Sequence, residues 1–150
     1  LIGIRPVSWI NDNFAIIIVL VATIITFFFK LNFKLIKKLL VLTDAFGIGF
    51  FTIVGLQIAL QAGISEGYAL IMGVITATFG GLLADVLCNS VPNLLKPGEL
   101  YATACLIGGA LYLAMRFFKI NHELSMIICV LITAAIRIYS IRKKLQLPVI

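Results

Sequence analysis

YALIMGVITATFGGLLADVLC, which occupies residues 68–88, is apolar almost throughout and holds one charged residue, Asp85. A helix needs roughly 20 mostly apolar residues to cross the hydrocarbon core of a bilayer, and this stretch has that length. A helix also pairs its own backbone groups, each of which would cost several kcal/mol if left unpaired in lipid. The stretch is therefore predicted to be a transmembrane helix.

Four other apolar stretches share this character and bring the prediction to about five transmembrane helices. They cover residues 13–29, 40–62, 99–118 and 122–141. The strands of a membrane barrel would be shorter and would alternate polar with apolar residues, and these runs are too long and uniform for that. We predict an all-α membrane protein.

Composition supports this fold class and excludes a soluble domain. Hydrophobic residues make up 62% of the chain and charged residues 12%, with a mean hydropathy of +1.17. Soluble domains are about 25% charged. The net charge of +6 comes from short basic clusters between apolar runs, not from a basic stripe with aromatic residues, so we expect no nucleic-acid partner.

Basic residues concentrate in the loops of one predicted membrane face, which the positive-inside rule assigns to the cytoplasm. That face includes the C-terminus and has eight of them: Lys30, Lys34, Lys37, Lys38, Lys96, Arg142, Lys143 and Lys144. The opposite face has three: Arg5, Arg116 and Lys119. The C-terminus is therefore predicted to be cytoplasmic, with the start of the chain outside.

The sequence offers no machinery for catalysis. It contains no nucleophile–base pair, phosphate-binding loop or metal-ligand cluster, so we expect neither an enzyme nor a cofactor or metal site. The three cysteines, Cys88, Cys105 and Cys129, are odd in number and lack CxxC spacing, which favours packing roles.

A weak internal match indicates an inverted repeat. Segments 1–6 and 87–92 both place a leucine five residues before a proline, in loops that precede an apolar helix. Three predicted helices separate these loops, so they lie on opposite membrane faces, as in inverted-repeat membrane proteins. We predict the end of one repeat at 1–39, a second three-helix repeat at 40–120, and a terminal helix with a basic tail at 121–150.

Two acidic residues, Asp44 and Asp85, fall at or near membrane depth, where ionisable groups are costly and usually serve a pathway or a partner. Asp44 stands near the predicted start of its helix, so it could instead be an N-terminal acid or cap after Thr43. Asp85 could instead pair at the interface with a base such as Lys96. We favour a functional role for Asp85 and leave both readings open for Asp44.

Gly80 and Gly81 interrupt an apolar helix and allow two interpretations. Small residues let membrane helices pack closely. Alternatively, the pair kinks or breaks the helix and opens a polar path beside Thr76 and Thr78. Other small residues are assigned to helix packing: Gly47, Gly49, Gly55 and Gly73.

Three polar or aromatic side chains are expected to lie near the membrane surfaces. Arg137 falls about one turn from the cytoplasmic end of its helix, and we expect its side chain to extend to the interface. His122 opens the same helix without a companion ligand, which is poor evidence for a metal. Tyr68 suits the aromatic belt at the membrane interface.

Several of these residues form a combination that resembles one family. It consists of Asp44-Ala45, Gly80-Gly81-Leu82-Leu83-Ala84-Asp85, Pro92 and Glu99-Leu100-Tyr101-Ala102. The combination resembles the YadS-like family of bacterial membrane proteins, which carries a glycine-transporter label and is related to the trimeric intracellular cation (TRIC) channels. The likeness covers essentially the whole chain and departs at Phe79 and Ala84, where the family pattern has a glycine and a basic residue.

The resemblance implies a homotrimer in the inner membrane, with a pore in every subunit that passes monovalent cations such as potassium. It implies seven helices, arranged as two inverted three-helix units plus one, so we expect this chain to lack the first two. Expected partners are monovalent cations and membrane lipids. The expected ion pathway comprises Asp44, Thr76, Thr78, Gly80, Gly81 and Asp85.

Two other function classes stay open. A secondary transporter or facilitator of a small solute such as glycine shares the inverted-repeat architecture, but it needs a closed midplane site and moving helices. A structural scaffold would leave Asp85 and the glycine pair unexplained. The low number of intramembrane charges favours a channel or a facilitator over a proton-coupled pump.

Overall fold

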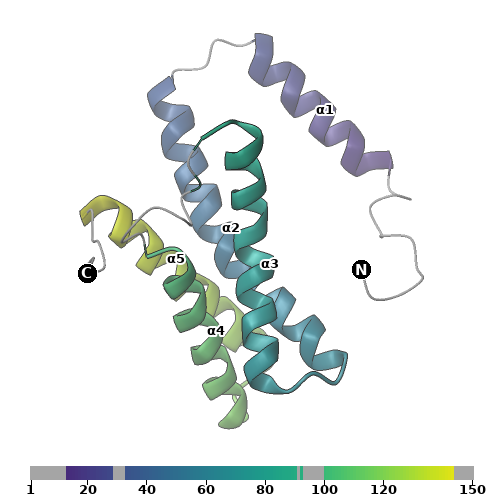
Figure 1. Cartoon of the computed structure of the whole chain (residues 1–150), viewed down its shortest axis with the longest axis vertical. Coiled ribbons are helices and arrows are strands. Elements are labelled where there is room, and N and C mark those ends of the chain that lie inside the picture. The colour runs from purple at the N-terminus through teal and green to yellow at the C-terminus, as the bar shows by residue number, and fades with distance from the viewer. Residues whose placement is uncertain (1–12, 29–32, 91, 93–99, 144–150) are drawn as a thin grey trace. The chain divides into compact units, whose positions relative to one another are not determined.

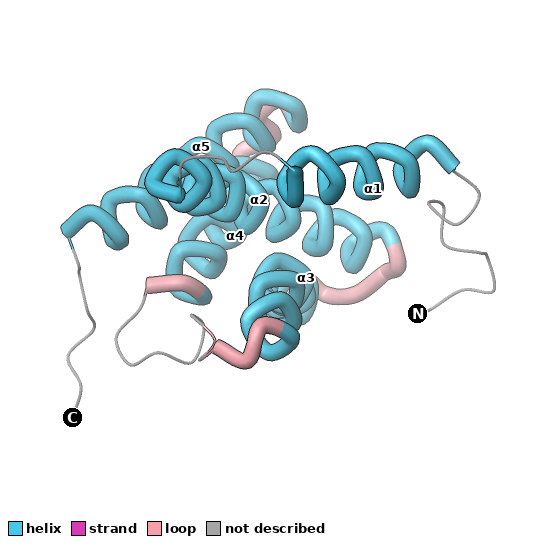
Figure 2. The backbone as a smooth tube through the Cα atoms, turned by 90° about the horizontal axis from the view of Figure 1, so that it is seen from above, coloured by secondary structure: helices cyan, strands magenta, loops and turns pink. Residues whose placement is uncertain are grey.

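The computed structural model describes residues 13–28, 33–90, 92 and 100–143, and the regular elements there are all helices (Figures 1 and 2). The all-α prediction is confirmed for this part of the chain. The five helices are α1 (Asn13–Phe28), α2 (Phe33–Gln61), α3 (Glu66–Leu87), α4 (Ala102–Phe117) and α5 (His122–Lys143).

The helix boundaries agree with the sequence prediction except at the start of α2. The segment 30–38 was expected to be a loop, but α2 begins at Phe33 and includes Lys34, Lys37 and Lys38. Lysine, leucine and isoleucine are tolerated or favoured in helices, so this helix continues beyond its apolar part. The loop prediction is therefore wrong for residues 33–38, and Lys30 lies outside the described residues.

Three of the described helices contain stretches long and apolar enough to cross a membrane: Lys38–Gln61, Glu66–Leu87 and His122–Lys143. The other two, α1 and α4, have 16 residues each. That length corresponds to about 24 Å of helix, somewhat less than the roughly 30 Å of a hydrocarbon core. Large apolar side chains such as Phe50, Ile58 and Leu131 are exposed, as suits surfaces that face lipid.

The chain divides into two compact units, Leu1–Lys38 and Leu39–Ile150. The first contains α1 and the first turns of α2. The second contains the remainder of α2 and α3 to α5, and the site described below lies wholly within it. The inverted repeat with boundaries at 39/40 and 120/121 stays a prediction.

Small residues allow the helices of the second unit to approach one another closely. A Cβ atom on Gly55 of α2 would lie 2.6 Å from Thr76 Oγ1 of α3, and one on Gly73 of α3 would lie 2.5 Å from the Thr52 carbonyl oxygen of α2. A Cβ on Gly108 of α4 would collide with Thr133 of α5. Such small-residue contacts are the usual means of packing helices in lipid, where apolar surface provides no driving force for association.

Replacing Gly73 by alanine should destabilise this contact. We expect Gly73→Ala to lower the free energy of unfolding by about 1–3 kcal/mol, because the new methyl group would press on the Thr52 backbone, which cannot simply rotate away. Thermal or denaturant unfolding in detergent measures the change. The matched control is Gly67→Ala in the same helix, where nothing described lies within 4 Å of the new atom; equal losses for both variants would refute the packing role.

Candidate functional site

Asp44 lies well inside α2 rather than at its start. The helix begins at Phe33, about three turns earlier, so Asp44 is not near the unpaired N–H groups of a helix N-terminus. Thr43 is not a cap either, because its hydroxyl donates to the carbonyl oxygens of Leu39 and Leu40 at 2.9 and 3.1 Å. The reading of Asp44 as an N-terminal acid is therefore wrong.

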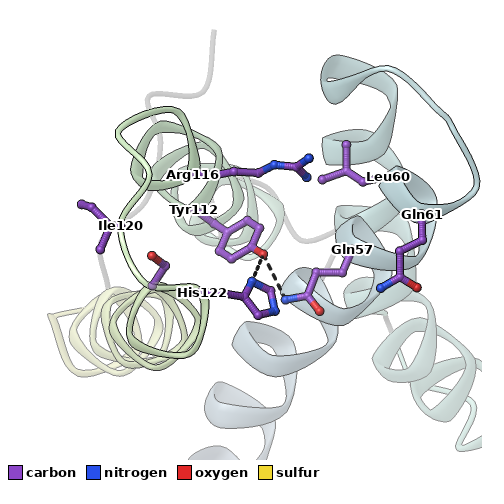
Figure 3. Close-up of a pocket in the computed structure, with 8 residues that line it drawn as sticks. Gln57, Leu60, Gln61, Tyr112, Arg116, Ile120 and His122 are labelled. Carbon is purple, nitrogen blue, oxygen red and sulfur yellow. Dashed lines mark hydrogen bonds between the residues drawn. The ribbon is translucent and has the colours of Figure 1, made fainter.

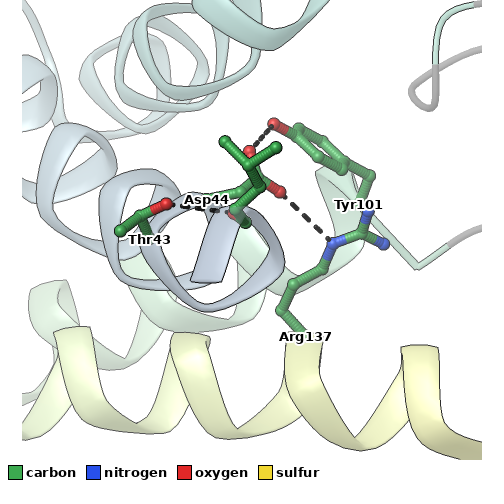
Figure 4. A network of polar contacts seen from close by, with 5 residues as sticks. Thr43, Asp44, Tyr101 and Arg137 are labelled. Carbon is green, nitrogen blue, oxygen red and sulfur yellow. Dashed lines mark hydrogen bonds and ion pairs between the residues drawn. The ribbon is translucent and has the colours of Figure 1, made fainter. Parts of the chain in front are cut away.

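Arg137 of α5 faces the interior of the second unit and meets Asp44 there. The residue is only 3% exposed, and its Nε lies 4.0 Å from Asp44 Oδ2 (Figure 4). The expectation that Arg137 extends to the membrane interface is wrong, because the counter-charge for its guanidinium is inside the protein. An arginine buried at this depth needs such a partner.

Tyr101, at the N-cap position of α4, completes this group of side chains. Its hydroxyl donates to Asp44 Oδ1 at 3.1 Å, and its ring centroid lies 4.5 Å from Arg137 Cζ. The guanidinium therefore gains a cation–π contact in addition to the carboxylate. Both oxygens of Asp44 are engaged, one by the tyrosine and one by the arginine. We call Asp44, Tyr101 and Arg137 the Asp44 cluster.

Gly81 of α3 leaves room for the cluster. A Cβ atom at Gly81 would lie 2.7 Å from the Tyr101 hydroxyl oxygen, so the phenol rests against bare helix backbone. All four helices of the second unit thus meet at one place. Asp44 and Arg137 each lie about 9 Å along their helices from the near end of the apolar span, at Lys38 and Lys143 respectively.

Asp85 lies about one turn beyond Gly81 on α3, near the end of that helix. Its carbonyl oxygen accepts a hydrogen bond of 3.0 Å from the Ser90 hydroxyl, whose oxygen also lies 3.4 Å from Asp85 Oδ1. The carboxylate is half-buried. The alternative partner, Lys96, falls outside the described residues, so the role of Asp85 stays a prediction.

The hydroxyls of Thr76 and Thr78 donate to their own helix, to the carbonyl oxygens of Met72 and Val74 at 2.8 and 2.9 Å. Thr76 lies at the contact between α2 and α3, whereas Thr78 is buried. Among the described residues, neither hydroxyl forms a hydrogen bond with the Asp44 cluster, and their place in an ion pathway stays a prediction.

The predicted glycines differ in their surroundings. The helix α3 runs continuously from Glu66 to Leu87, so the helix is not broken at Gly80-Gly81. Among the described residues, nothing lies within 4 Å of a Cβ built on Gly80 or on Gly47. Within the described part of the chain, Gly47 therefore has no packing neighbour at this position, unlike Gly55 and Gly73.

Sequence reasoning found Asp44 but missed its two partners. Tyr101 entered only as part of a family motif, and Arg137 was treated as a residue of one isolated helix. The sequence nevertheless contained a usable signal. The loop charges place the start of the helix that holds Asp44 and the end of the helix that holds Arg137 on the same membrane face. The two residues carry opposite charges and lie at similar distances from those helix ends, so they were candidates for an ion pair.

Comparisons with known proteins agree with this architecture. The family model described as "Glycine transporter" matches residues 41–116. The UPF0126 inner membrane protein YadS of Escherichia coli K12 is 33% identical over 95% of this chain and 70% of its own length. A UPF0126 membrane protein of Vibrio cholerae is 34% identical over 98% of this chain and 62% of its own length.

Two solved structures are similar over nearly the whole chain. One, from a study of conductance through TRIC cation channels, has a TM-score of 0.80 at 30% identity and covers 98% of this chain and 71% of its own. The other, the TRIC trimeric intracellular cation channel orthologue from Rhodobacter sphaeroides, has a TM-score of 0.82 at 32% identity over 95% and 73%. The chain is a channel-like membrane protein, and relatives of channel and transport type fit a non-enzymatic role.

Asp44 and Arg137 should show energetic coupling in a double-mutant cycle. We expect Asp44→Asn and Arg137→Gln each to destabilise the protein, and the double variant to lose less than their sum by about 1–3 kcal/mol, because the second change removes a charge that the first left uncompensated. Asp44 is 38% exposed, so solvent screening favours the lower end of this range. Denaturant unfolding in detergent measures all four proteins.

A matched cycle uses Arg142→Gln, which removes the same charge from an exposed position in the last turn of α5. Its effect should add to that of Asp44→Asn within about 0.5 kcal/mol. Additivity in the Arg137 cycle as well would contradict the ion pair.

Proposed function

The chain belongs to the UPF0126 family of membrane proteins, the family of YadS, and from this membership we propose that it is a channel for monovalent cations such as potassium. The observation that carries the proposal is the Asp44 cluster. It keeps a carboxylate within the apolar span of α2 with 38% of its side chain exposed, while the side chain of its arginine partner is only 4% exposed. Such an arrangement is costly in a membrane and is usually retained for a pathway.

The pairing of Asp44 suits weak cation binding. A lone carboxylate at membrane depth would hold a cation tightly, because charges interact strongly where the dielectric constant is low. The guanidinium of Arg137 offsets much of that attraction, and the Tyr101 hydroxyl occupies one carboxylate oxygen. Conduction requires sites that are favourable enough to enter and weak enough to leave, and a partly neutralised carboxylate meets both conditions.

The proposed path continues along α3, past Gly80 and Gly81 towards Asp85. The missing side chain at Gly80 leaves open space on the helix surface among the described residues. Hydroxyl oxygens such as those of Thr76 and Thr78 retain acceptor capacity after donating to the helix, so they could help to replace the water of a passing cation. Asp85 would then attract cations at the end of the path.

We further propose a homotrimer in the inner membrane, with one pore per subunit, lipid on its outer face and the C-terminus in the cytoplasm. A solved relative is described as trimeric and the Escherichia coli relative as an inner membrane protein, which supports the assembly and the location. The excess of basic residues in one set of loops supports the orientation.

The alternative function is the transport or facilitated passage of a small solute such as glycine. The description of the matching family model favours it. It would require a closed site near the membrane midplane and helices that move around it.

Planar-bilayer recording on the full-length protein tests the proposal. We expect single-channel steps whose reversal potential in a potassium chloride gradient follows potassium. Asp85→Asn should lower the conductance at low salt by about fivefold, since a nearby unit charge in water contributes about 1 kcal/mol of attraction. The loss should shrink at high salt, where charges are screened.

The control is Glu66→Gln, which removes a carboxylate from the opposite end of α3 and should leave the conductance unchanged. If no single-channel steps are recorded and proteoliposomes take up glycine in a saturable manner, the proposed function as a channel is wrong and the protein is a transporter.

A further inference from the structure

A second polar region lies at the other end of the second unit, where loops join α2 to α3 and α4 to α5. It surrounds a pocket with a volume of about 430 Å³ (Figure 3). On α2, Gln57 of this pocket is about 20 Å along the helix from Asp44, so the two sites are separate. The residues that line the pocket are Gln57, Leu60, Gln61, Tyr112, Arg116, Ile120, His122 and Ser125.

A chain of hydrogen bonds fixes one wall of the pocket. Gln57 Nε2 donates to the Tyr112 hydroxyl at 3.1 Å, and this hydroxyl lies 2.9 Å from His122 Nδ1. The tyrosine hydroxyl thus joins Gln57 to the Nδ1 side of the His122 ring. The other ring nitrogen, Nε2, is left for a ligand.

The orientation of the Gln57 amide is consistent with this chain. Its Nε2 also lies 3.9 Å from Met126 Sδ, an acceptor without a proton to donate. Tyr112 is only 2% exposed, so its two polar contacts hold the wall in place from a buried position. The wall is preorganised before any ligand arrives.

Charge distinguishes this pocket from the Asp44 cluster. Among the described residues, Arg116 is the one permanently charged residue that lines the pocket, and no carboxylate lines it. Within the part of the chain that the structure describes, no acidic side chain lies within ion-pair distance of Arg116. The backbone N–H groups at the start of α5 could also attract an anion, but two of them are already used: Asn121 Oδ1 accepts from the Glu123 and Leu124 amides at 2.9 and 3.3 Å. Arg116 is therefore the dominant attraction for an anion in this pocket.

We propose that this pocket binds an oxyanion, a carboxylate or phosphate group, with Arg116 as its principal partner. The planar guanidinium presents paired N–H donors that match two oxygens of such a group. The amide groups of Gln57 and Gln61 and the His122 ring supply further polar contacts, and the volume falls in the range of small-ligand sites. The site is distinct from the proposed cation path and does not depend on it.

The oxyanion could come from a soluble anion or from a lipid headgroup, and two measurements separate these sources. The full-length protein in a phosphate-free maltoside detergent is titrated with acetate and with inorganic phosphate, followed by calorimetry. A second titration uses a short-chain phosphatidylglycerol. Binding of acetate or phosphate identifies a soluble anion, whereas binding of phosphatidylglycerol alone identifies a lipid headgroup.

Variants of the lining residues test whether binding takes place in this pocket. We expect Arg116→Gln to weaken the affinity about tenfold or more, as the loss of a charge-assisted contact implies, and Arg116→Lys to weaken it less. Gln61→Glu places a carboxylate in the pocket at an exposed position and should abolish binding without loss of the fold.

The matched control is Lys119→Asn, which removes a positive charge from the loop just after α4, three residues from Arg116, but not from the pocket. Asparagine suits the left-handed backbone of this position, where φ is 53°. The affinity of the Lys119→Asn variant for the probe that binds should equal that of the unaltered protein. The proposal is overturned if none of the three probes binds, if binding survives both Arg116→Gln and Gln61→Glu, or if Lys119→Asn weakens it as much as Arg116→Gln.

Discussion

A guanidinium buried within a membrane-spanning helix needs a counter-charge, and the arrangement of the second unit satisfies that need. Arg137 of α5 can reach Asp44 of α2 only if the two helices lie very close. Gly49 permits this, since a Cβ there would lie 2.9 Å from the Val130 carbonyl oxygen of α5. Tyr101 then adds α4 to the ion pair, and Gly81 lets α3 lie against the phenol. Small residues and one charge pair, whose arginine is buried, thus hold four helices in a single arrangement.

The two ends of the second unit have opposite chemistry. At one end a partly exposed carboxylate, balanced by Arg137 and Tyr101, suits weak contact with a cation. At the other end Arg116 faces a pocket that no carboxylate of the described residues lines, and Tyr112 fixes the wall of this pocket. About 20 Å of α2 separates them, so each can be altered without direct contact with the other. The proposed cation path and the proposed oxyanion site are accordingly separate, and each can be tested without the other.

Hydropathy was enough to predict the helices, because the need to pair backbone groups in lipid leaves few alternatives for long apolar runs. Hydropathy failed where a helix extends beyond its apolar part, as in the first turns of α2, which contain lysines. It therefore placed Asp44 at the start of a helix, although the helix begins about three turns earlier. The partners of Asp44 could not be predicted from any one helix. Arg137 was expected at the interface because an isolated helix offers it no acid, and only tertiary packing supplies one.

Water access to position 44 tests the central claim that the Asp44 cluster lies on a cation path. The measurement is modification of Asp44→Cys by a charged, water-soluble thiol reagent during bilayer recording, in a Cys88→Ser background, since the other two cysteines are buried. The control, Ala45→Cys, places the thiol at a neighbouring position that is 0% exposed. If Asp44 lies on a cation path, the reagent blocks current through Asp44→Cys but not through Ala45→Cys. An unreactive thiol at position 44, or a current indifferent to its modification, would contradict it.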